Sequence, residues 1–319
     1  MRSLHMIAVA TTRCLLLAAA LSLALIAASA TASEGPLARA TPFTHEPPTN
    51  GAVAHGSTCT GSPQAPGVLT GKYYAGVTVT GECVVDDGEV VIYGNLTLAT
   101  GSAVLAAFGS NDVTHSGISR LIVHGNVHVG AGASLLMGCE PNYFPCLDDP
   151  NPEAATLSSV GRIYGSLTAR ESLGVVLHNS IIEGNLLQGE GGGGLQCVPQ
   201  GVFEFFPVYS DYEDLTVGGR MMVKDLQSCW LGVARVHVGG KLDLVGDQLA
   251  DPDAIEILAN TVAGNLSCRG DSRVWDSAEA GEELYPRAAE PNTVAGQRFG
   301  QCKLASSETE GGPLGPGAF

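Results

Sequence analysis

Carboxylates and basic side chains are concentrated in one stretch of the sequence, between residues 218 and 244. A carboxylate beside an arginine or lysine could act on acidic polysaccharides as part of a lyase or hydrolase. That chemistry needs several such groups on one face, and the alternative is a solvated outer face. The residues concerned are Arg220, Lys224, Asp225, Arg235, Lys241 and Asp243. The Gly-x-Ser-x-Gly, His-Glu-x-x-His and P-loop motifs do not occur in the sequence, so we assign no catalytic residue.

Other side chains have the chemistry of metal ligands without the spacing. His124 and His128 would lie about 13 Å apart on one continuous strand, so we expect solvent-facing histidines. The acidic turns at 146–152 and 247–253 offer oxygen ligands of the kind that calcium prefers. Neither turn matches the EF-hand or the calcium-binding nonapeptide. We therefore expect solvated turns, no metal and no cofactor.

Aromatic side chains gather in the segment 203–212. If exposed, they could stack on sugar rings or dock a protein partner, because exposed aromatic patches mark interaction sites. The alternative is a loop folded back over an apolar flank. The candidate binding residues are Phe203, Phe205, Phe206, Tyr209 and Tyr212.

The composition restricts the elements that position these groups. The 319 residues include 42 glycines, well above the usual ~7%. A helical bundle is disfavoured, because each glycine costs a helix about 1 kcal/mol. The formal charge of −16 argues against a nucleic-acid partner, which requires a basic face.

A short unit recurs along the chain. It consists of a short alternating apolar run, then Gly-Asn, Gly-Ser or Gly-Gly, then a second short run. The central glycines are at 94, 125, 165, 184, 240 and 264. Several of their spacings are multiples of a coil of about 20 residues with loop insertions. Runs of three or four residues are too short for stable isolated hairpins.

These repeats predict an all-β, single-stranded β-solenoid (β-helix) with loop insertions. A β-sandwich or two small β domains are the alternatives. We expect the corner glycines to supply unusual backbone angles. We expect the asparagines of successive coils to bond side chain to side chain, as in amide ladders.

Two identical segments, Asn260–Gly264 and Asn292–Gly296, read Asn-Thr-Val-Ala-Gly, and a cysteine follows each. We expect successive coils with a disulfide between them. The region 260–302 resembles a C-terminal signature of uncharacterised exported proteins from actinobacteria. The Gly-Asn-Leu coils also resemble bactofilins, which polymerise through a β-helix. Both resemblances imply a β-helical fold, and neither brings catalytic residues.

The expected organisation is a signal peptide (1–32), a disordered Pro/Thr/Ala-rich linker (33–66), the solenoid domain (67–305) and a disordered tail (306–319). Removing the signal peptide leaves an even number of cysteines, which predicts disulfides in an oxidising compartment. Nearest-neighbour pairing is one of 105 connectivities. It would join Cys59 to Cys83, Cys139 to Cys146, Cys197 to Cys229 and Cys268 to Cys302.

The sequence thus favours a secreted or envelope-associated protein that meets a membrane only during export. A non-catalytic scaffold or recognition protein is the first hypothesis, with a cell-wall or extracellular glycan or a protein as partner. A polysaccharide lyase or hydrolase on a β-helix and a self-assembling surface polymer are the alternatives.

Overall fold

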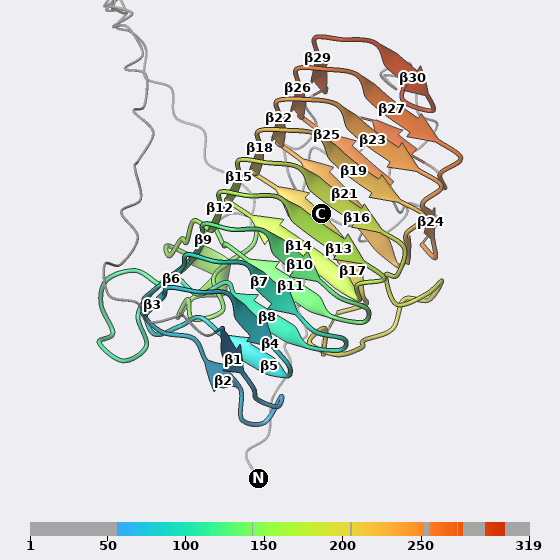
Figure 1. Ribbon diagram of the computed structural model, residues 1–319. Coiled ribbons are helices and arrows are strands. Elements are labelled where there is room, and N and C mark those ends of the chain that lie inside the picture. Colours follow the sequence, from blue (N-terminus) through green and yellow to red (C-terminus); the bar gives the residue numbers. More distant parts are fainter. Residues whose placement is uncertain are drawn as a thin grey trace, which may run out of the picture. The chain divides into compact units, whose positions relative to one another are not determined.

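The protein is a β-solenoid in which short parallel strands stack into three long sheets (Figure 1). This computed structural model describes residues 56–141, 143–204, 206–251, 255–272, 274–276 and 291–303. The expected signal peptide and tail lie outside these residues, as does the linker up to residue 55. Each coil contributes one strand to each sheet in turn, which confirms the all-β solenoid expected from the repeats.

Sheet 1 comprises the first strand of every coil. Its strands are β1 (Ser57–Cys59), β4 (Val77–Val79), β7 (Leu96–Leu98), β10 (Val127–Val129), β13 (Leu167–Arg170), β16 (Leu186–Gly189), β19 (Met221–Lys224), β23 (Leu242–Val245), β27 (Leu266–Arg269) and β30 (Arg298–Gly300).

Sheet 2 comprises the second strand of each coil. Its strands are β2 (Gly67–Val68), β5 (Glu82–Val84), β8 (Ala103–Ala106), β11 (Ser134–Met137), β14 (Gly174–His178), β17 (Tyr209–Glu213), β21 (Trp230–Ala234), β25 (Ile255–Leu258) and β28 (Val274–Asp276).

Sheet 3 completes each coil. Its strands are β3 (Lys72–Tyr73), β6 (Glu89–Ile92), β9 (Arg120–Val123), β12 (Arg162–Ile163), β15 (Ile181–Ile182), β18 (Thr216–Val217), β22 (His237–Val238), β26 (Thr261–Val262) and β29 (Thr293–Val294). A separate pair, β20 (Gln227–Ser228) and β24 (Gln248–Leu249), lies outside the three sheets.

Aliphatic side chains stack in register to form the core. The strand alternation turns every second residue inward, so the interior of each coil packs on the interior of the next. One continuous row runs through sheet 1, and all of its members are at most 1% exposed: Val77, Leu96, Val127, Leu167, Leu186, Met221, Leu242 and Leu266.

The corner between sheet 3 and sheet 1 contains the recurring glycines. Their backbones touch from coil to coil, as when the N–H of Gly125 donates to the carbonyl of Gly94. A Cβ on Gly125 would lie 2.5 Å from that carbonyl oxygen and 2.4 Å from Oδ1 of Asn95. The glycines at 94, 125, 165, 184, 240 and 264 all have φ outside the positive region. Glycine is therefore required here by close approach, and the expected unusual backbone angles are wrong.

The asparagine or serine that follows most of these glycines forms hydrogen bonds from coil to coil, with the backbone of the next coil as the donor. The Oδ1 atom of Asn95 accepts from the backbone N–H of Asn126 at 2.8 Å. Asn126 in turn accepts from the N–H of Ser166 at 2.9 Å, and Asn185 accepts from the N–H of Arg220 at 2.9 Å. At this corner the asparagines thus cap the backbone of the next coil. A side-chain to side-chain bond of the expected kind occurs at the corner between sheets 2 and 3, where Asn260 Nδ2 donates to Asn292 Oδ1 at 2.8 Å.

At the other two corners, too, side-chain oxygens accept hydrogen bonds from the backbone of a neighbouring coil, but the residues differ. Between sheets 1 and 2, Asp247 Oδ1 accepts from the N–H of Leu226, and Asp271 Oδ1 accepts from the N–H of Asp247, both at 2.9 Å. Between sheets 2 and 3, Asn260 Oδ1 accepts from the N–H of Val236 at 2.8 Å. Positive φ angles occur at these corners in non-glycine residues, among them Glu190, Asp214, Asp225 and Arg235.

Four disulfides fasten the coils and their insertions, and the nearest-neighbour pairing is confirmed. Cys59–Cys83 joins the first two coils, and Cys139–Cys146 closes a loop in the segment between β11 and β12. Cys197–Cys229 ties the insertion before β17 to the solenoid. Cys268–Cys302 links the successive coils that carry the two identical segments, whose threonines are direct partners in sheet 3.

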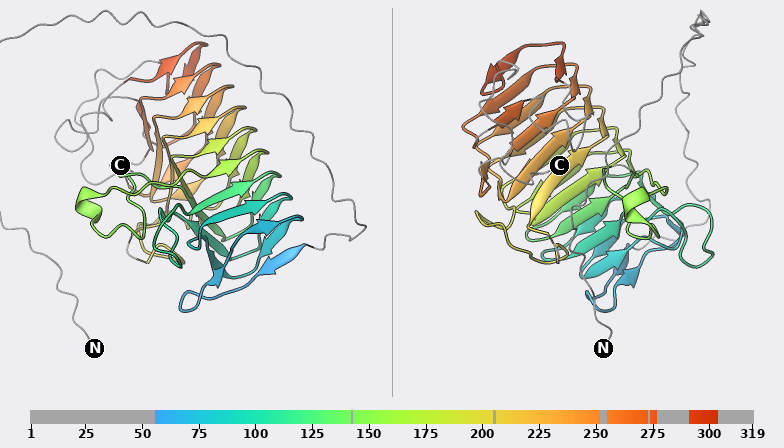
Figure 2. Two further views of the ribbon diagram at one scale, coloured as in Figure 1. Left: turned by 90° about the vertical axis from the view of Figure 1, so that its left-hand side faces the viewer. Right: turned by 180° about the vertical axis from the view of Figure 1, so that it is seen from behind.

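Loop insertions account for the uneven coil lengths. The longest lies between β11 and β12, contains the short 3₁₀ helix η1 (Pro152–Ala154), and stands off the stack (green in Figure 2, left). The first coil begins at Ser57, where β1 pairs with β4. The solenoid therefore includes the residues from 57 to 66, which we expected in the linker.

Replacing Gly125 by alanine should destabilise the fold by about 1–3 kcal/mol, because the new methyl group overlaps the backbone of the preceding coil. Gly189→Ala is the matched control, since its Cβ would meet nothing closer than 3.8 Å. Denaturant unfolding of both variants is the measurement. Equal stability of the two would contradict close packing at the corner.

The stability of the protein should depend on pH through Asp247. Burial raises the pKa of this carboxyl to about 7; hydrogen bonds from the backbone of Leu226 and Val245 lower it, and the charges of Asp271 and Asp225 raise it. Because the folded state holds the proton above the ordinary pKa of 3.8, the free energy of unfolding falls as pH rises from about 4 to 7. Asp247→Asn should make this pH dependence shallower, and unfolding curves at several pH values measure it. Parallel pH profiles for the two proteins would rule out the assignment.

Candidate functional site

A shallow groove of about 490 Å³ crosses the outer face of sheet 1 over β13, β16 and β19. Three basic residues line it, namely Arg170, Arg220 and Lys224. Leu187 and Met222 contribute outward-facing apolar side chains to its floor. The groove is notable because the chain as a whole is strongly acidic.

Register explains how residues far apart in the sequence meet in this groove. Arg170, Gly189 and Lys224 are direct partners on three successive strands, so they lie in one row across the coils. Gly189 leaves the middle of that row without a side chain. Among the residues described, Arg170 and Arg220 have no ion pair, whereas Lys224 lies 3.0 Å from Asp225. Two cations of the groove are thus available to an anionic ligand.

Two carboxylates, Glu171 and Glu190, also line the groove. Both are exposed and lie at the corner that follows sheet 1, with φ near +52° and +61°. A neighbouring hollow of about 530 Å³ shares them and adds Asp225 and Gln227. Carboxylates and cations therefore converge on one face, as a lyase or hydrolase would require.

The six charged candidates from the sequence divide among four places. Arg220 and Lys224 line the groove, whereas Lys241 pairs with Asp243 at 2.7 Å outside it. Asp225 belongs to the neighbouring hollow. Arg235 lies at another corner, in the buried network described below. The stretch 218–244 does not form one cleft.

The aromatic segment 203–212 is not one exposed surface. Phe203 is 4% exposed and packs with Val176 and Val208 against sheet 2, and Tyr209 meets its ring at 5.4 Å. Tyr212 lies inside the coil, fully buried, and its hydroxyl donates to Gln188 Oε1 at 2.6 Å. Phe206 is 62% exposed, and Phe205 lies outside the described residues. The hypothesis of a shared binding patch is corrected accordingly: only Phe206 presents its ring to solvent among the four residues seen.

His124 and His128 are both exposed, as expected. His124 also belongs to a row of stacked rings that sequence reasoning missed. Tyr74, Tyr93, His124 and Tyr164, on four successive coils, stack with centroids 4.6–5.3 Å apart. The sequence contained a signal for this row, because each of the four aromatic residues lies one or two positions before a corner glycine. Stacked rings present their edges to solvent, so most of this row has no free face for a sugar.

The carboxylates of the acidic turn at 146–152 accept hydrogen bonds from backbone N–H groups of this loop and of the segment between β8 and β9. Asp148 accepts from the N–H groups of Gly109 and Ser110, both at 2.8 Å, and Asp149 accepts from three amides of its own loop. These hydrogen bonds lower the pKa of Asp148 against the effect of its partial burial. The carboxylates organise the insertion between β11 and β12.

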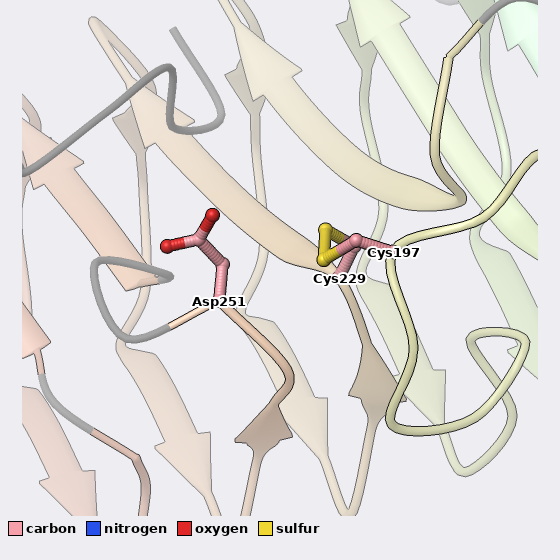
Figure 3. Close-up of side chains that lie close together, drawn as sticks. All are labelled: Cys197, Cys229 and Asp251. Carbon is pink, nitrogen blue, oxygen red and sulfur yellow. A yellow bond between two sulfur atoms is a disulfide. The ribbon is translucent and has the colours of Figure 1, made fainter.

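Cys197, Cys229 and Asp251 lie close together with the spacing of metal ligands. Figure 3 shows that the two sulfur atoms are joined in a disulfide, so no thiolate is available to an ion. Asp251 accepts a hydrogen bond from the indole N–H of Trp230 at 3.1 Å. This group therefore fastens the insertion before β17.

A buried ionisable network lies at the corner between sheets 2 and 3, and sequence reasoning missed it. Its members come from four separate segments, so no spacing in the sequence signals it. His178 ends β14 and is the register partner of Glu213, which ends β17. Arg235 bonds to Glu213 at 2.6 Å and to Asp214 at 2.9 Å. Glu140, from the disulfide-closed loop, faces the same histidine.

Electrostatics within this network are strongly perturbed. Burial alone would lower the pKa of His178, but Asp211, Glu140 and Glu213 outweigh it and raise the pKa to about 10. Burial and the neighbouring Asp211 raise the pKa of Glu213 to about 8. Burial, together with Glu140, raises the pKa of Asp214 to about 6. The raised pKa values of Glu213 and Asp214 thus reflect several carboxyl groups that share one buried place beside the imidazole.

Comparisons with protein-family models, with curated proteins and with solved structures found no match for this chain. The four disulfides indicate an oxidising environment. Across the described part of the chain, no helix is long and apolar enough to cross a membrane.

Tyr212→Phe should destabilise the protein by about 1–3 kcal/mol, because it leaves the buried oxygen of Gln188 without its donor. Phe206→Ser should change stability by less than about 0.5 kcal/mol, as an exposed substitution. Chemical denaturation compares the two. A larger loss from Phe206→Ser would show that the segment packs differently.

Proposed function

We propose that this is an exported, non-catalytic recognition or scaffold protein that binds an acidic polysaccharide along sheet 1. The observation that carries the proposal is the groove lined by Arg170, Arg220 and Lys224 on an otherwise acidic molecule. The expected signal peptide and the four disulfides support export.

The geometry of the groove favours a polymer over a small anion. It crosses three strands, whose spacing of about 4.8 Å is close to the length of one sugar residue in an extended chain. Successive carboxylated sugars could therefore meet successive coils. Leu187 and Met222 offer apolar contacts to the sugar rings between the charged groups.

Net charge adds selectivity to the site. The acidic molecule as a whole repels anionic polymers, so attraction should be strongest at the groove, where the guanidinium groups of Arg170 and Arg220 have no ion pair among the described residues. Binding that depends on these exposed charges should weaken as salt is added.

Reversing the charge of Arg170 or Arg220 to glutamate should weaken binding of an oligogalacturonate by about tenfold, or about 1.4 kcal/mol. Lys72→Glu is the matched control, because it makes the same charge change on β3 of sheet 3. Isothermal titration calorimetry at low salt, with a neutral glucan oligosaccharide for comparison, measures the affinities. Absence of binding by the unchanged protein, or equal losses in all three variants, would refute the proposal.

A polysaccharide lyase is the second candidate, favoured by the presence of Glu171 and Glu190 in the same groove as the cations. A carboxylate could abstract a proton from a uronate whose own carboxylate is neutralised by arginine. The calorimetric samples should be assayed for unsaturated products and new reducing ends. Turnover that is lost in Glu171→Gln or Glu190→Gln would make the protein an enzyme.

A further inference from the structure

The buried network at the corner between sheets 2 and 3 contains polar atoms that have no hydrogen-bond partner. His178 is 1% exposed, and neither of its ring nitrogens has a hydrogen bond of acceptable geometry among the described residues. The Oε1 atom of Glu140 is also buried and has no hydrogen-bond partner among the described residues. An unsatisfied buried polar group is costly, so a cluster of them requires an explanation.

The distances around His178 are too long for hydrogen bonds on one side of the ring. Its Nδ1 atom lies 3.5 Å from Oε2 of Glu213 and 3.8 Å from Oε1 of Glu140. Hydrogen bonds between such atoms are about 2.7–3.2 Å long. Ligands of a tetrahedral zinc ion, at about 2.0–2.2 Å from the metal, lie about 3.3–3.5 Å apart. The separation of His178 Nδ1 from Glu213 Oε2 matches that range, and the separation from Glu140 Oε1 exceeds it by about 0.3 Å.

The other side of the ring has a different role. Nε2 lies 3.1 Å from Oδ2 of Asp211, which is close enough for a hydrogen bond once a small turn of the ring or the carboxylate aligns the N–H with the oxygen. A carboxylate on one ring nitrogen holds the tautomer that leaves the other nitrogen's lone pair free for a metal. Asp211 and Glu213 can act together because they alternate with the buried Tyr212 and so project from the same face of β17.

Charge also favours a cation at this place. Four carboxylates, from Glu140, Asp211, Glu213 and Asp214, surround a single guanidinium, that of Arg235. Oε2 of Glu213 accepts from Arg235 at 2.6 Å and keeps a second lone pair. The same carboxylates that stabilise a proton on His178 would stabilise a divalent ion that replaces this proton.

We propose that Glu140, His178 and Glu213 form a binding site for a divalent transition-metal ion of the zinc class. Their ligand atoms lie within 4.8 Å of one another. With three protein ligands, the fourth position of a tetrahedral ion would hold water.

The ion would fasten the loop closed by Cys139–Cys146 to the solenoid. Glu140 belongs to that loop, whereas His178 and Glu213 belong to adjacent strands of sheet 2. Two aromatic residues of the loop cover the site: Phe144 stacks on His178 with centroids 4.3 Å apart, and Tyr143 lies 3.6 Å from the guanidinium of Arg235.

Zinc binding to the disulfide-intact protein tests the proposal. The protein is freed of metal with a chelator and titrated with zinc chloride by calorimetry, and its melting temperature is followed by scanning calorimetry. One equivalent should bind, and the melting temperature should rise, because an ion that binds only the folded state stabilises it. A protein that binds no zinc would overturn the proposal.

Glu140→Gln should lower the zinc affinity by at least about tenfold and remove the rise in melting temperature. Glu153→Gln is the matched control, as an exposed carboxylate of the same insertion, and should leave both unchanged. Unchanged affinity in a folded Glu140→Gln protein would contradict the assignment.

If Glu140→Gln fails to fold, the unchanged protein still decides the question. Anomalous diffraction at the zinc edge should place the ion between Glu140, His178 and Glu213. X-ray absorption should show nitrogen and oxygen ligands with an imidazole and no sulfur. An ion located elsewhere on the chain would overturn the proposal.

Discussion

The hydrogen bonds between neighbouring coils at the corners are the constraint on which this structure depends. Strands within a sheet satisfy their backbones by pairing, but at each corner the chain turns and some N–H groups lose their strand partner. Stacked coils are only about 4.8 Å apart, so a hydrogen-bond acceptor for these N–H groups must come from the adjacent coil. Side-chain oxygens of Asn95, Asn126 and Asn185 supply it at one corner, and those of Asp247 and Asn260 at the others.

This repeated capping keeps the coils in register. Register in turn positions the residues of both candidate sites, the groove on sheet 1 and the network around His178. Arg170 and Lys224 occupy one row of sheet 1 because β13, β16 and β19 pair without slipping. His178 and Glu213 are brought together by the same pairing in sheet 2. A shift of one residue would turn these side chains to the opposite face of their sheet. Residues that are one coil apart in the sequence therefore lie side by side in rows on the surface of the solenoid.

Sequence reasoning predicted what depends on local pattern. The alternation around Gly-Asn predicted the strands and their inward-facing rows. The nearest-neighbour cysteine pairing, chosen among 105 connectivities because it links neighbouring local units, is the one observed. The identical segments at 260 and 292 were correctly interpreted as successive coils. The role of glycine was misjudged, because the clash that excludes a side chain at Gly125 comes from Gly94 and Asn95 of another coil.

What the sequence did not predict depends on how insertions cover the outer face of sheet 2. Tyr212 was named as a candidate binding residue of a loop, either exposed or folded back, yet it belongs to β17, occupies an inward position and bonds to Gln188. The network around His178 combines a loop residue, Glu140, with strand ends from other coils. Only register and loop packing together bring these residues into contact.

A crystal structure of the protein with a bound oligogalacturonate would test the central claim, that register on sheet 1 brings cations from separate coils into one groove that binds an acidic polymer. The account predicts a sugar chain that crosses β13, β16 and β19 with its carboxylates at Arg170 and Arg220. An oligosaccharide bound away from sheet 1, for instance against Phe206, would contradict it.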